Sequence, residues 1–346
     1  MEVCAKIALI LNFLPKLHLP KPMNTLSQLK KPIEADLELF QEVFKNSVKS
    51  KVPLLDIIMR YLLKAKGKQL RPVIVVYSAA LFAKPNEVTY RAASLIELLH
   101  TATLVHDDVV DDASHRRGRF SINALWRNKI AVLAGDYLLS RGMLLALKSK
   151  DYSILEIVSE AVKEMSEGEL LQMEKARKLD IDEAVYYDVI RKKTASLLAS
   201  CFAAGAASTS NDPELIRRMW QIGELAGMAF QIKDDLFDFQ KNNLTGKPSG
   251  IDIKEKKMTL PLIYALSKAT FLEKRKIINI VKNHNTDENR VSWLMDFVKE
   301  NGGLAYAENK MNELKKQSLD LLYTFPENQA RKALEQLVVF SIERSK

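Results

Sequence analysis

Two short stretches of the chain each place three aspartates close together. The first, at residues 107–111, reads DDVVD, and the second, at residues 234–238, reads DDLFD. On a helix of 3.6 residues per turn, positions i, i+1 and i+4 fall within an arc of about 100°. Carboxylates that converge on one face are the hard oxygen ligands that suit Mg²⁺. Each stretch is therefore a candidate metal site, with a solvated acidic face as the alternative.

Apolar neighbours favour the metal site over the solvated face. The first stretch follows LLHTATLV at residues 98–105, and phenylalanines flank the second at Phe230 and Phe239. Two acidic clusters that faced each other across a helical bundle would repel strongly unless cations lay between them. In proteins, Mg²⁺ is usually bound by one or two carboxylates together with water and substrate phosphate. The sequence therefore predicts a phosphorylated substrate held by metal ions.

Two arginines, Arg116 and Arg117, follow the first stretch at once. A guanidinium group presents paired donors that match the oxygens of a phosphate group. The arginines are therefore candidate ligands of the same phosphorylated substrate.

The pattern of the surrounding chain predicts helices. No proline occurs between Asn86 and Asp212, and the whole chain has only 12 glycines. Apolar residues recur at spacings of three and four, as in ILEIVSEAVKEM at residues 154–165, and strand-like alternation is absent. We predict an all-α fold of about ten or more helices, packed as a single large bundle.

Several positions indicate where these helices begin and end. Asp212 is a predicted N-cap, and Asp180 with Glu183 fits a variant of the capping box. Residues 241–250, which read KNNLTGKPSG, predict a loop. A further helix is expected to restart after Gly302 and Gly303.

The composition is that of a globular protein with a sizeable core. The 346 residues are 47% hydrophobic and 27% charged, and the net charge is +9. Such a charge could favour nucleic acid, a membrane surface or phosphorylated small molecules, but no motif supports nucleic acid. Two cysteines in no paired pattern fit a reducing, cytoplasmic compartment. No apolar run approaches the roughly 18 residues that a transmembrane helix needs.

Residues 1–22 differ from the rest of the chain. They hold a short apolar core followed by three prolines, without the basic start or the cleavage site of a signal peptide. We expect a disordered or loosely docked extension, with one catalytic domain over residues 23–346.

Six motifs in a fixed order resemble the trans-isoprenyl diphosphate synthases, also called polyprenyl synthetases. They read GKQLRP at 67–72, HDDVVDDASHRRG at 106–118, GDYLL at 135–139, KTASL at 193–197, FQIKDDLFD at 230–238 and GKPSGIDIKEKKMTLPLI at 246–263. The resemblance covers the chain from about Met23 onward and is closest to bacterial long-chain, octaprenyl-type enzymes. It implies the isoprenoid synthase fold, with helices around a central cavity, and usually a homodimer.

The resemblance also implies a reaction and its residues. An allylic diphosphate such as farnesyl diphosphate ionises with the help of about three Mg²⁺ and condenses head-to-tail, in trans geometry, with isopentenyl diphosphate. The family's metal ligands match Asp107, Asp108, Asp111, Asp234, Asp235 and Asp238. Its isopentenyl diphosphate site matches Lys68, Arg71, His100 and Arg117, and its allylic site matches Arg116, Lys193, Thr194, Gln231, Lys247 and Lys257. Among these, Asp107, Asp108, Asp111, Lys193, Asp234 and Lys247 are the candidate catalytic residues.

Product length depends in this family on residues that precede the first acidic stretch. By resemblance, Ala102 and Thr103 line the tunnel for the growing chain, and Leu98 and Leu99 lie one turn further back. The small side chain of Ala102 favours a product of about C35 to C45, of the kind used as a quinone side chain. The small residues at 199–208 indicate either close helix packing or a roomy tunnel.

Three other functions compete with a long-chain synthase. A short-chain synthase that makes geranylgeranyl or farnesyl diphosphate is the main alternative. A terpene cyclase usually carries a different second metal motif, and a non-catalytic partner subunit typically loses aspartates from one motif. All six aspartates are present here, which argues against the last two. At most, we expect peripheral membrane contact for product release.

Overall fold

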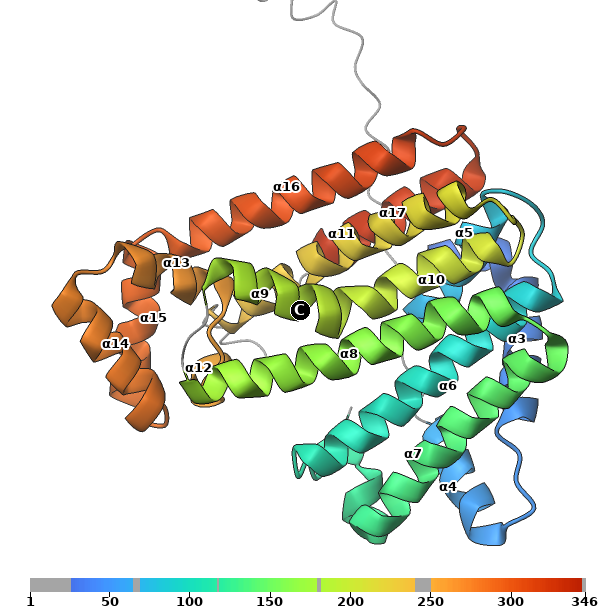
Figure 1. Ribbon diagram of the computed structural model, residues 1–346, viewed down its shortest axis with the longest axis horizontal. Helices are drawn as coiled ribbons and strands as arrows, with labels where there is room; N and C mark the ends of the chain where they lie inside the picture. The colour runs from blue at the N-terminus through green and yellow to red at the C-terminus, as the bar shows by residue number, and fades with distance from the viewer. Residues whose placement is uncertain (1–25, 65–68, 117, 179–181, 240–249, 344–346) are drawn as a thin grey trace, which may run out of the picture.

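The structure is a computed structural model, shown in Figure 1. It describes residues 26–64, 69–116, 118–178, 182–239 and 250–343. The predicted extension at residues 1–22 lies outside the described residues, and so do Lys68, Arg117 and Lys247.

Nearly every described element is a helix, which confirms the all-α prediction. The first half of the chain contains α2 (Leu26–Lys30), η1 (Lys31–Ile33), α3 (Glu34–Ser47), α4 (Pro53–Lys64), α5 (Leu70–Ala80), α6 (Glu87–Val110), α7 (Ile122–Ser149) and α8 (Tyr152–Lys178). The second half contains α9 (Glu183–Ile190), η2 (Arg191–Ala195), α10 (Ser196–Ala207), α11 (Pro213–Asp238), α12 (Ile251–Lys254), α13 (Leu260–Lys268), α14 (Phe271–Asn283), α15 (Glu288–Glu300), α16 (Gly303–Tyr323) and α17 (Gln329–Glu343). The strands β1 (His115–Arg116) and β2 (Arg119–Phe120) form an antiparallel hairpin.

The small-residue helix α10 lies in the core of the bundle. Residues 199–206 are all buried, so close helix packing explains this stretch. A Cβ added at Gly223 of α11 would lie only 2.6 Å from the Cα of Ala199, and one at Gly227 only 2.6 Å from the Cα of Ala195. Because glycine alone permits such an approach, α11 is held close against α10 and η2.

The helix ends follow local capping chemistry, with one correction. Asp212 caps α11 as predicted, and its carboxylate accepts hydrogen bonds from the backbone of Glu214 and Leu215. The prediction of a cap at Asp180 is wrong. The N-cap of α9 is Asp182, whose carboxylate accepts the backbone N–H of Val185. Because the helix starts at Glu183, that glutamate occupies the first turn too early to complete a capping box.

Helix α7 corrects the expectation that no segment is apolar and long enough to cross a membrane. By length and composition it passes that test, which the core helix of a soluble protein can also pass. Only 33% of its apolar window is buried. Its exposed side chains include Val132, Leu133, Leu144 and Leu147, which recur on one side of the helix. The structure therefore leaves an apolar face of α7 uncovered.

A kink in α7 generates the first prediction. Arg127 interrupts the helix with φ 68° and ψ 164°, a conformation that is essentially restricted to glycine and costs about 1–3 kcal/mol for other residues. We expect Arg127→Gly to raise the free energy of unfolding by about 1–2 kcal/mol, after the extra entropy of glycine in the unfolded chain is deducted. Urea denaturation at a fixed protein concentration measures the change. The control is Arg127→Ala, which removes the side chain but keeps the Cβ, and an equal gain there would contradict the backbone explanation.

Candidate active site

The two acidic stretches lie at the C-terminal ends of two core helices. Asp107 and Asp108 are in the last turn of α6, and Asp111 is its C-cap. Asp234 and Asp238 lie in the last turns of α11. The C-terminus of a helix carries partial negative charge, so carboxylates there are unfavourable without nearby cations. The local fold therefore concentrates a negative potential at both helix ends.

The second aspartate of the first stretch turns into the protein. Asp108 is buried, and Nε of Arg116 donates to its carboxylate at 2.6 Å. The β1–β2 hairpin, which turns at Gly118 with φ +74°, brings this arginine back over the end of α6. Asp108 thus orients an arginine that was predicted to bind phosphate.

The second aspartate of the second stretch, Asp235, is likewise buried and hydrogen-bonded to protein side chains. The hydroxyl of Tyr186 donates to one oxygen of Asp235 at 2.7 Å, and Nε2 of Gln231 donates to the other at 2.8 Å. Burial raises the pKa of Asp235 to about 7, although the two hydrogen bonds oppose that shift. A further hydrogen bond extends this network, because the hydroxyl of Thr194 donates to Oε1 of Gln231 at 2.8 Å. One network thereby joins α9, α11 and η2.

The remaining aspartates have a different environment. Asp107 is only partly buried, and burial followed by the nearby Glu169 carboxylate raises its pKa. Asp238 accepts the backbone N–H groups of Ile251 and Asp252 at 2.9 and 3.1 Å, which ties the end of α11 to α12. Positions i and i+4 lie about 40° apart on a helix, whereas i+1 lies about 100° away. The spacing therefore separates an outward pair from an inward aspartate in each stretch.

Lys193 lies on η2, which packs against both α8 and α11. Its Nζ is 2.5 Å from Glu169 and donates to Gln172 at 2.9 Å, both on α8. Its positive charge also acts on Asp107, and its neighbour Thr194 is bonded to α11. Lys193 belongs to η2, a π-helical turn, and such turns occur often at functional sites.

Sequence reasoning missed Glu169 and Gln172. They stand three residues apart on α8 in the stretch GELLQ, and this spacing places both on one helix face. Gly168 precedes them, and a Cβ there would lie 2.7 Å from the backbone nitrogen of Lys193. A glycine beside two polar residues at helical spacing was the available signal for this contact.

Lys257 also belongs to this region. Its Nζ lies 2.5 Å from Glu255. Burial lowers the pKa of Lys257, but the hydrogen bond and charge of Glu255 outweigh burial, and the pKa stays above its ordinary value. Glu169 contributes to the same upward shift, so α8 and the segment after α12 share one electrostatic field.

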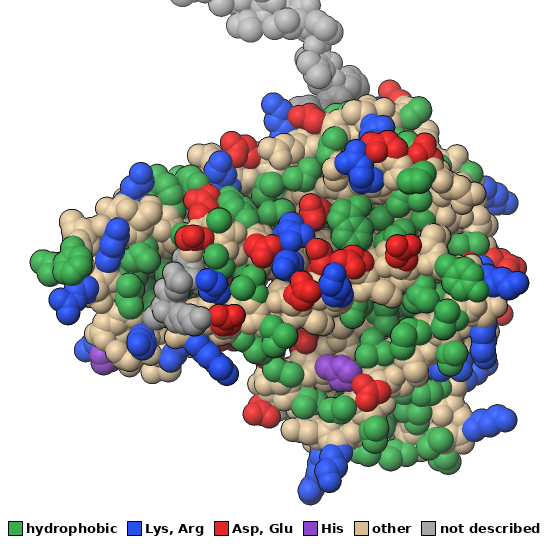
Figure 2. Space-filling model, in the orientation of Figure 1, with side chains coloured by type: hydrophobic (Ala, Val, Ile, Leu, Met, Phe, Trp, Pro, Cys, Tyr) green, Lys and Arg blue, Asp and Glu red, His purple; other side chains and the backbone are tan. Residues whose placement is uncertain are grey.

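The described residues do not form a complete metal cage. Among them, no three acidic, histidine or cysteine side chains converge closely enough to hold a metal ion by themselves. This arrangement fits Mg²⁺, which usually binds one or two carboxylates together with water and substrate phosphate. Figure 2 shows that the surface is hollowed between α8 and α6, with acidic and basic side chains around the rim.

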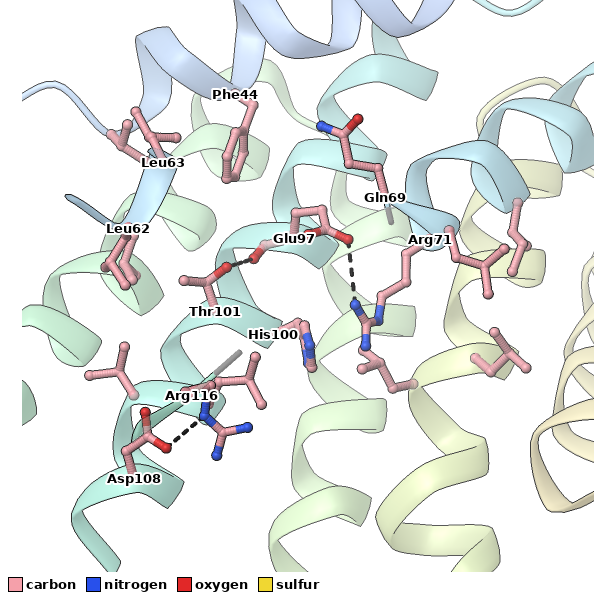
Figure 3. Close-up of a pocket in the computed structure, with 18 of the residues that line it drawn as sticks. Phe44, Leu62, Leu63, Gln69, Arg71, Glu97, His100, Thr101, Asp108 and Arg116 are labelled. Atoms are coloured by element: carbon pink, nitrogen blue, oxygen red, sulfur yellow. Dashed lines mark hydrogen bonds and ion pairs between the residues drawn. The ribbon is translucent and has the colours of Figure 1, made fainter. Parts of the chain in front are cut away.

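A cavity of about 660 Å³ lies between α6 and the helices α5, α10 and α11. Arg71, Glu97 and His100 project into it, with Asp108 and Arg116 nearby (Figure 3). Nη1 of Arg71 lies 3.6 Å from Glu97. Apolar side chains complete the wall, including Phe44, Leu62, Leu63, Leu104, Phe202 and Phe230. The cavity can hold an anionic group at its polar end and a short apolar group beside it.

The four predicted chain-length residues do not line this cavity. Leu98 and Ala102 are fully buried and pack in the cluster that contains Ala131 and Ala134 of α7. Leu99 is also buried. Thr103 is half-buried, and its hydroxyl donates to the backbone oxygen of His100. These residues therefore occupy other faces of α6, and their role in chain length stays a prediction.

Comparisons with known proteins cover most of the chain. The model of the family "Polyprenyl synthetase" matches residues 52–298. An all-trans-nonaprenyl-diphosphate synthase (geranyl-diphosphate specific) from Rhodobacter capsulatus is 33% identical over 315 residues, 90% of this chain and 96% of the relative.

Two solved structures share the fold. A polyprenyl synthase from Caulobacter crescentus, complexed with calcium and isoprenyl diphosphate, has a TM-score of 0.84 at 31% identity, over 94% of this chain and 99% of that one. A geranylgeranyl pyrophosphate synthase from Bacteroides thetaiotaomicron has a TM-score of 0.78 at 37% identity, over 92% and 99%. A divalent metal and an isoprenyl diphosphate are thus bound by a protein of this fold.

The contact between α8 and η2 yields a prediction. Gly168→Ala places a Cβ 2.7 Å from the backbone of Lys193, so one helix must shift. We expect the free energy of unfolding to fall by about 1–3 kcal/mol, as in other overpacked contacts. Urea denaturation checks this, with the exposed Ser159→Ala on the same helix as control. An unchanged midpoint for Gly168→Ala would show that the two backbones can separate freely.

Proposed function

The chain belongs to the polyprenyl synthetase family, and from this premise we propose that it makes a long-chain polyprenyl diphosphate. It is a prenyltransferase that condenses isopentenyl diphosphate with an allylic diphosphate. The observation that carries the proposal is the pair of acidic helix ends on α6 and α11, with the charge of Lys193 acting on Asp107 of the first.

We assign the allylic diphosphate to the hollow between these helix ends. Asp107 with Asp111, and Asp234 with Asp238, are the pairs that fit metal ions. About three Mg²⁺, when bound, would stabilise the charge that develops on the departing diphosphate. Asp108 and Asp235 serve in this proposal as positioning residues, because each is buried and held by side-chain donors of the protein.

The chain's own cations complete the allylic site. Arg116, held by Asp108, presents its remaining guanidinium donors to the diphosphate. Lys193 is paired with Glu169 in the structure, so the diphosphate must attract this lysine away from a carboxylate. Lys247 and Lys257 are the family's further lysines here. Thr194 and Gln231, locked together by a hydrogen bond, face the reacting end of the allylic chain.

The cavity beside α6 is the proposed site of isopentenyl diphosphate. Arg71 and His100 line its polar end, and the family places Lys68 and Arg117 there as well. The apolar wall suits a five-carbon chain. Thr194 of the proposed allylic site lines the same cavity, so the two substrates can meet beside α6.

Two features of the chain and its relatives bear on product length. A nonaprenyl synthase among the relatives and the small Ala102 support a product of about C35 to C45 for a quinone side chain. The likeness to a geranylgeranyl pyrophosphate synthase keeps the short-chain alternative open. The intact aspartates of the second stretch continue to disfavour a cyclase or a non-catalytic subunit.

We further propose a cytoplasmic homodimer. The uncovered apolar face of α7 is the surface that would contact the second copy. Exposed apolar patches on a protein surface commonly mark subunit interfaces, and the stripe along this long helix is such a patch.

Removing one aspartate from each stretch tests the metal assignment. Asp107→Ala and Asp234→Ala should each lower turnover of farnesyl and isopentenyl diphosphates by at least about a hundredfold, because the leaving charge loses its stabilisation. Circular dichroism should show intact helices. The exposed Asp296→Ala on α15 is the matched control and should keep full turnover. Near-normal activity of either site variant at saturating Mg²⁺ would contradict the assignment of that aspartate to metal binding.

Two neighbouring substitutions test where the growing chain runs. Ala102→Phe should shorten the product to about C15 to C20, since the added ring overpacks the predicted tunnel face. Thr101→Phe, on the cavity face, should weaken isopentenyl diphosphate binding without shortening the product. Chromatography of dephosphorylated products measures both. The reverse pattern would place the growing chain in the cavity beside α6.

A further inference from the structure

Helix α14 presents an unusual surface at one end of the molecule. Phe271 and Leu272, its first two residues, are 72% and 76% exposed. These are the largest exposed fractions of any large hydrophobic side chain in the described residues. Ile278 adds a third exposed apolar side chain, 38% exposed, two turns along.

The helix is amphipathic, and its two faces differ in kind. Ile277, Ile280 and Val281 form the buried face. The exposed residues lie within an arc of about 160° on the opposite side. They are Phe271, Leu272, Arg275, Lys276, Ile278, Asn279, Lys282 and Asn283. This outward face of α14 therefore combines apolar and cationic side chains.

The outward face of α14 carries no carboxylate. The acidic residue of the helix, Glu273, is used by the capping box, where it accepts the backbone and hydroxyl groups of Thr270. Arg275 lies over the Phe271 ring at 5.8 Å, and Lys276 lies over the Trp293 ring at 3.4 Å. In the part of the chain that the structure describes, neither cation forms a salt bridge with a carboxylate. Figure 2 shows hydrophobic and basic side chains together at the left-hand end of the molecule, where Figure 1 places α14.

We propose that the outward face of α14 docks the protein onto an anionic lipid bilayer. A helix that exposes large apolar side chains beside arginine or lysine can lie in the plane of the membrane–water interface. The apolar groups enter the acyl boundary, and the cations remain at the headgroups. Each basic side chain near an anionic surface adds to the attraction, and this part weakens as salt is added.

The charge of this face selects lipid over the other candidate occupants. A second copy would bring the same cations against Arg275 and Lys282, which repel. A stable protein interface also needs roughly 800 Å² from each partner, more than one short helix face supplies. The uncovered face of α7, a separate helix far from α14 in Figure 1, stays free for subunit contact. Docking is thus compatible with the proposed homodimer and does not depend on the product.

Vesicle sedimentation of the full-length protein tests the proposal. Vesicles of phosphatidylglycerol and phosphatidylcholine in equal parts should bind the wild type, and pure phosphatidylcholine vesicles should bind it at least about tenfold less. Phe271→Ser/Leu272→Ser and Arg275→Glu/Lys282→Glu should each lower the partition coefficient at least about tenfold. Turnover of both variants should match the wild type, since neither pair touches the active site.

Matched substitutions elsewhere keep the test specific. Tyr152→Ser replaces another exposed aromatic residue, 60% exposed, and Lys51→Glu/Lys84→Glu makes the same charge change away from α14. Both should bind mixed vesicles as the wild type does. Equal binding to the two kinds of vesicle, wild-type binding by the α14 variants, or equal losses in the controls would each overturn the proposal.

Discussion

Repulsion among the carboxylates at the ends of α6 and α11 is the constraint that the other residues of the site must offset. Both helices point their negative ends at their own aspartates, so the fold adds a backbone field to the side-chain charges. Arg116 neutralises one inward carboxylate, and donors from α9 and α11 satisfy the other. The outward carboxylates are the ones that the proposed metal ions and diphosphate would use.

Tight backbone contacts hold this charged site in register. Gly168 lets α8 approach Lys193, and Gly227 lets α11 approach the turn that carries Thr194. These contacts set the positions of the helices. The buried hydrogen-bond network from Tyr186 to Thr194 then sets the positions of the side chains. Because a buried polar group loses more when unpaired than it gains when paired, such a network tolerates one arrangement only. Packing and hydrogen bonding thus specify the same geometry independently.

The sequence predicted the parts of this structure that depend on local spacing. Helix periodicity, the cap at Asp212 and the aspartate clusters all follow from residues within a few turns. It could not predict that Asp235 bonds Tyr186, or that Lys193 bonds Glu169, because those partners lie 49 and 24 positions away. The cap at Asp182 was missed for a different reason. Two aspartates compete within three positions, and only the start of the helix decides between them.

Helix α6 explains why product length resists prediction from sequence. Three faces of one helix have different surroundings: Asp107 lies near Lys193 and Glu169, Leu104 faces the cavity, and Ala102 faces α7. Measured round the axis from Asp107, Leu104 lies at about 60° and Ala102 at about 220°. A chain that lengthened past Ala102 would have to part α6 from α7, which are packed there without exposed surface. A chain that followed Thr103, about 40° from Asp107, would leave that packing intact. A chain along Ala102 would therefore be limited by the packing of α6 against α7, whereas a chain along Thr103 would not, and sequence spacing alone does not decide between the two paths.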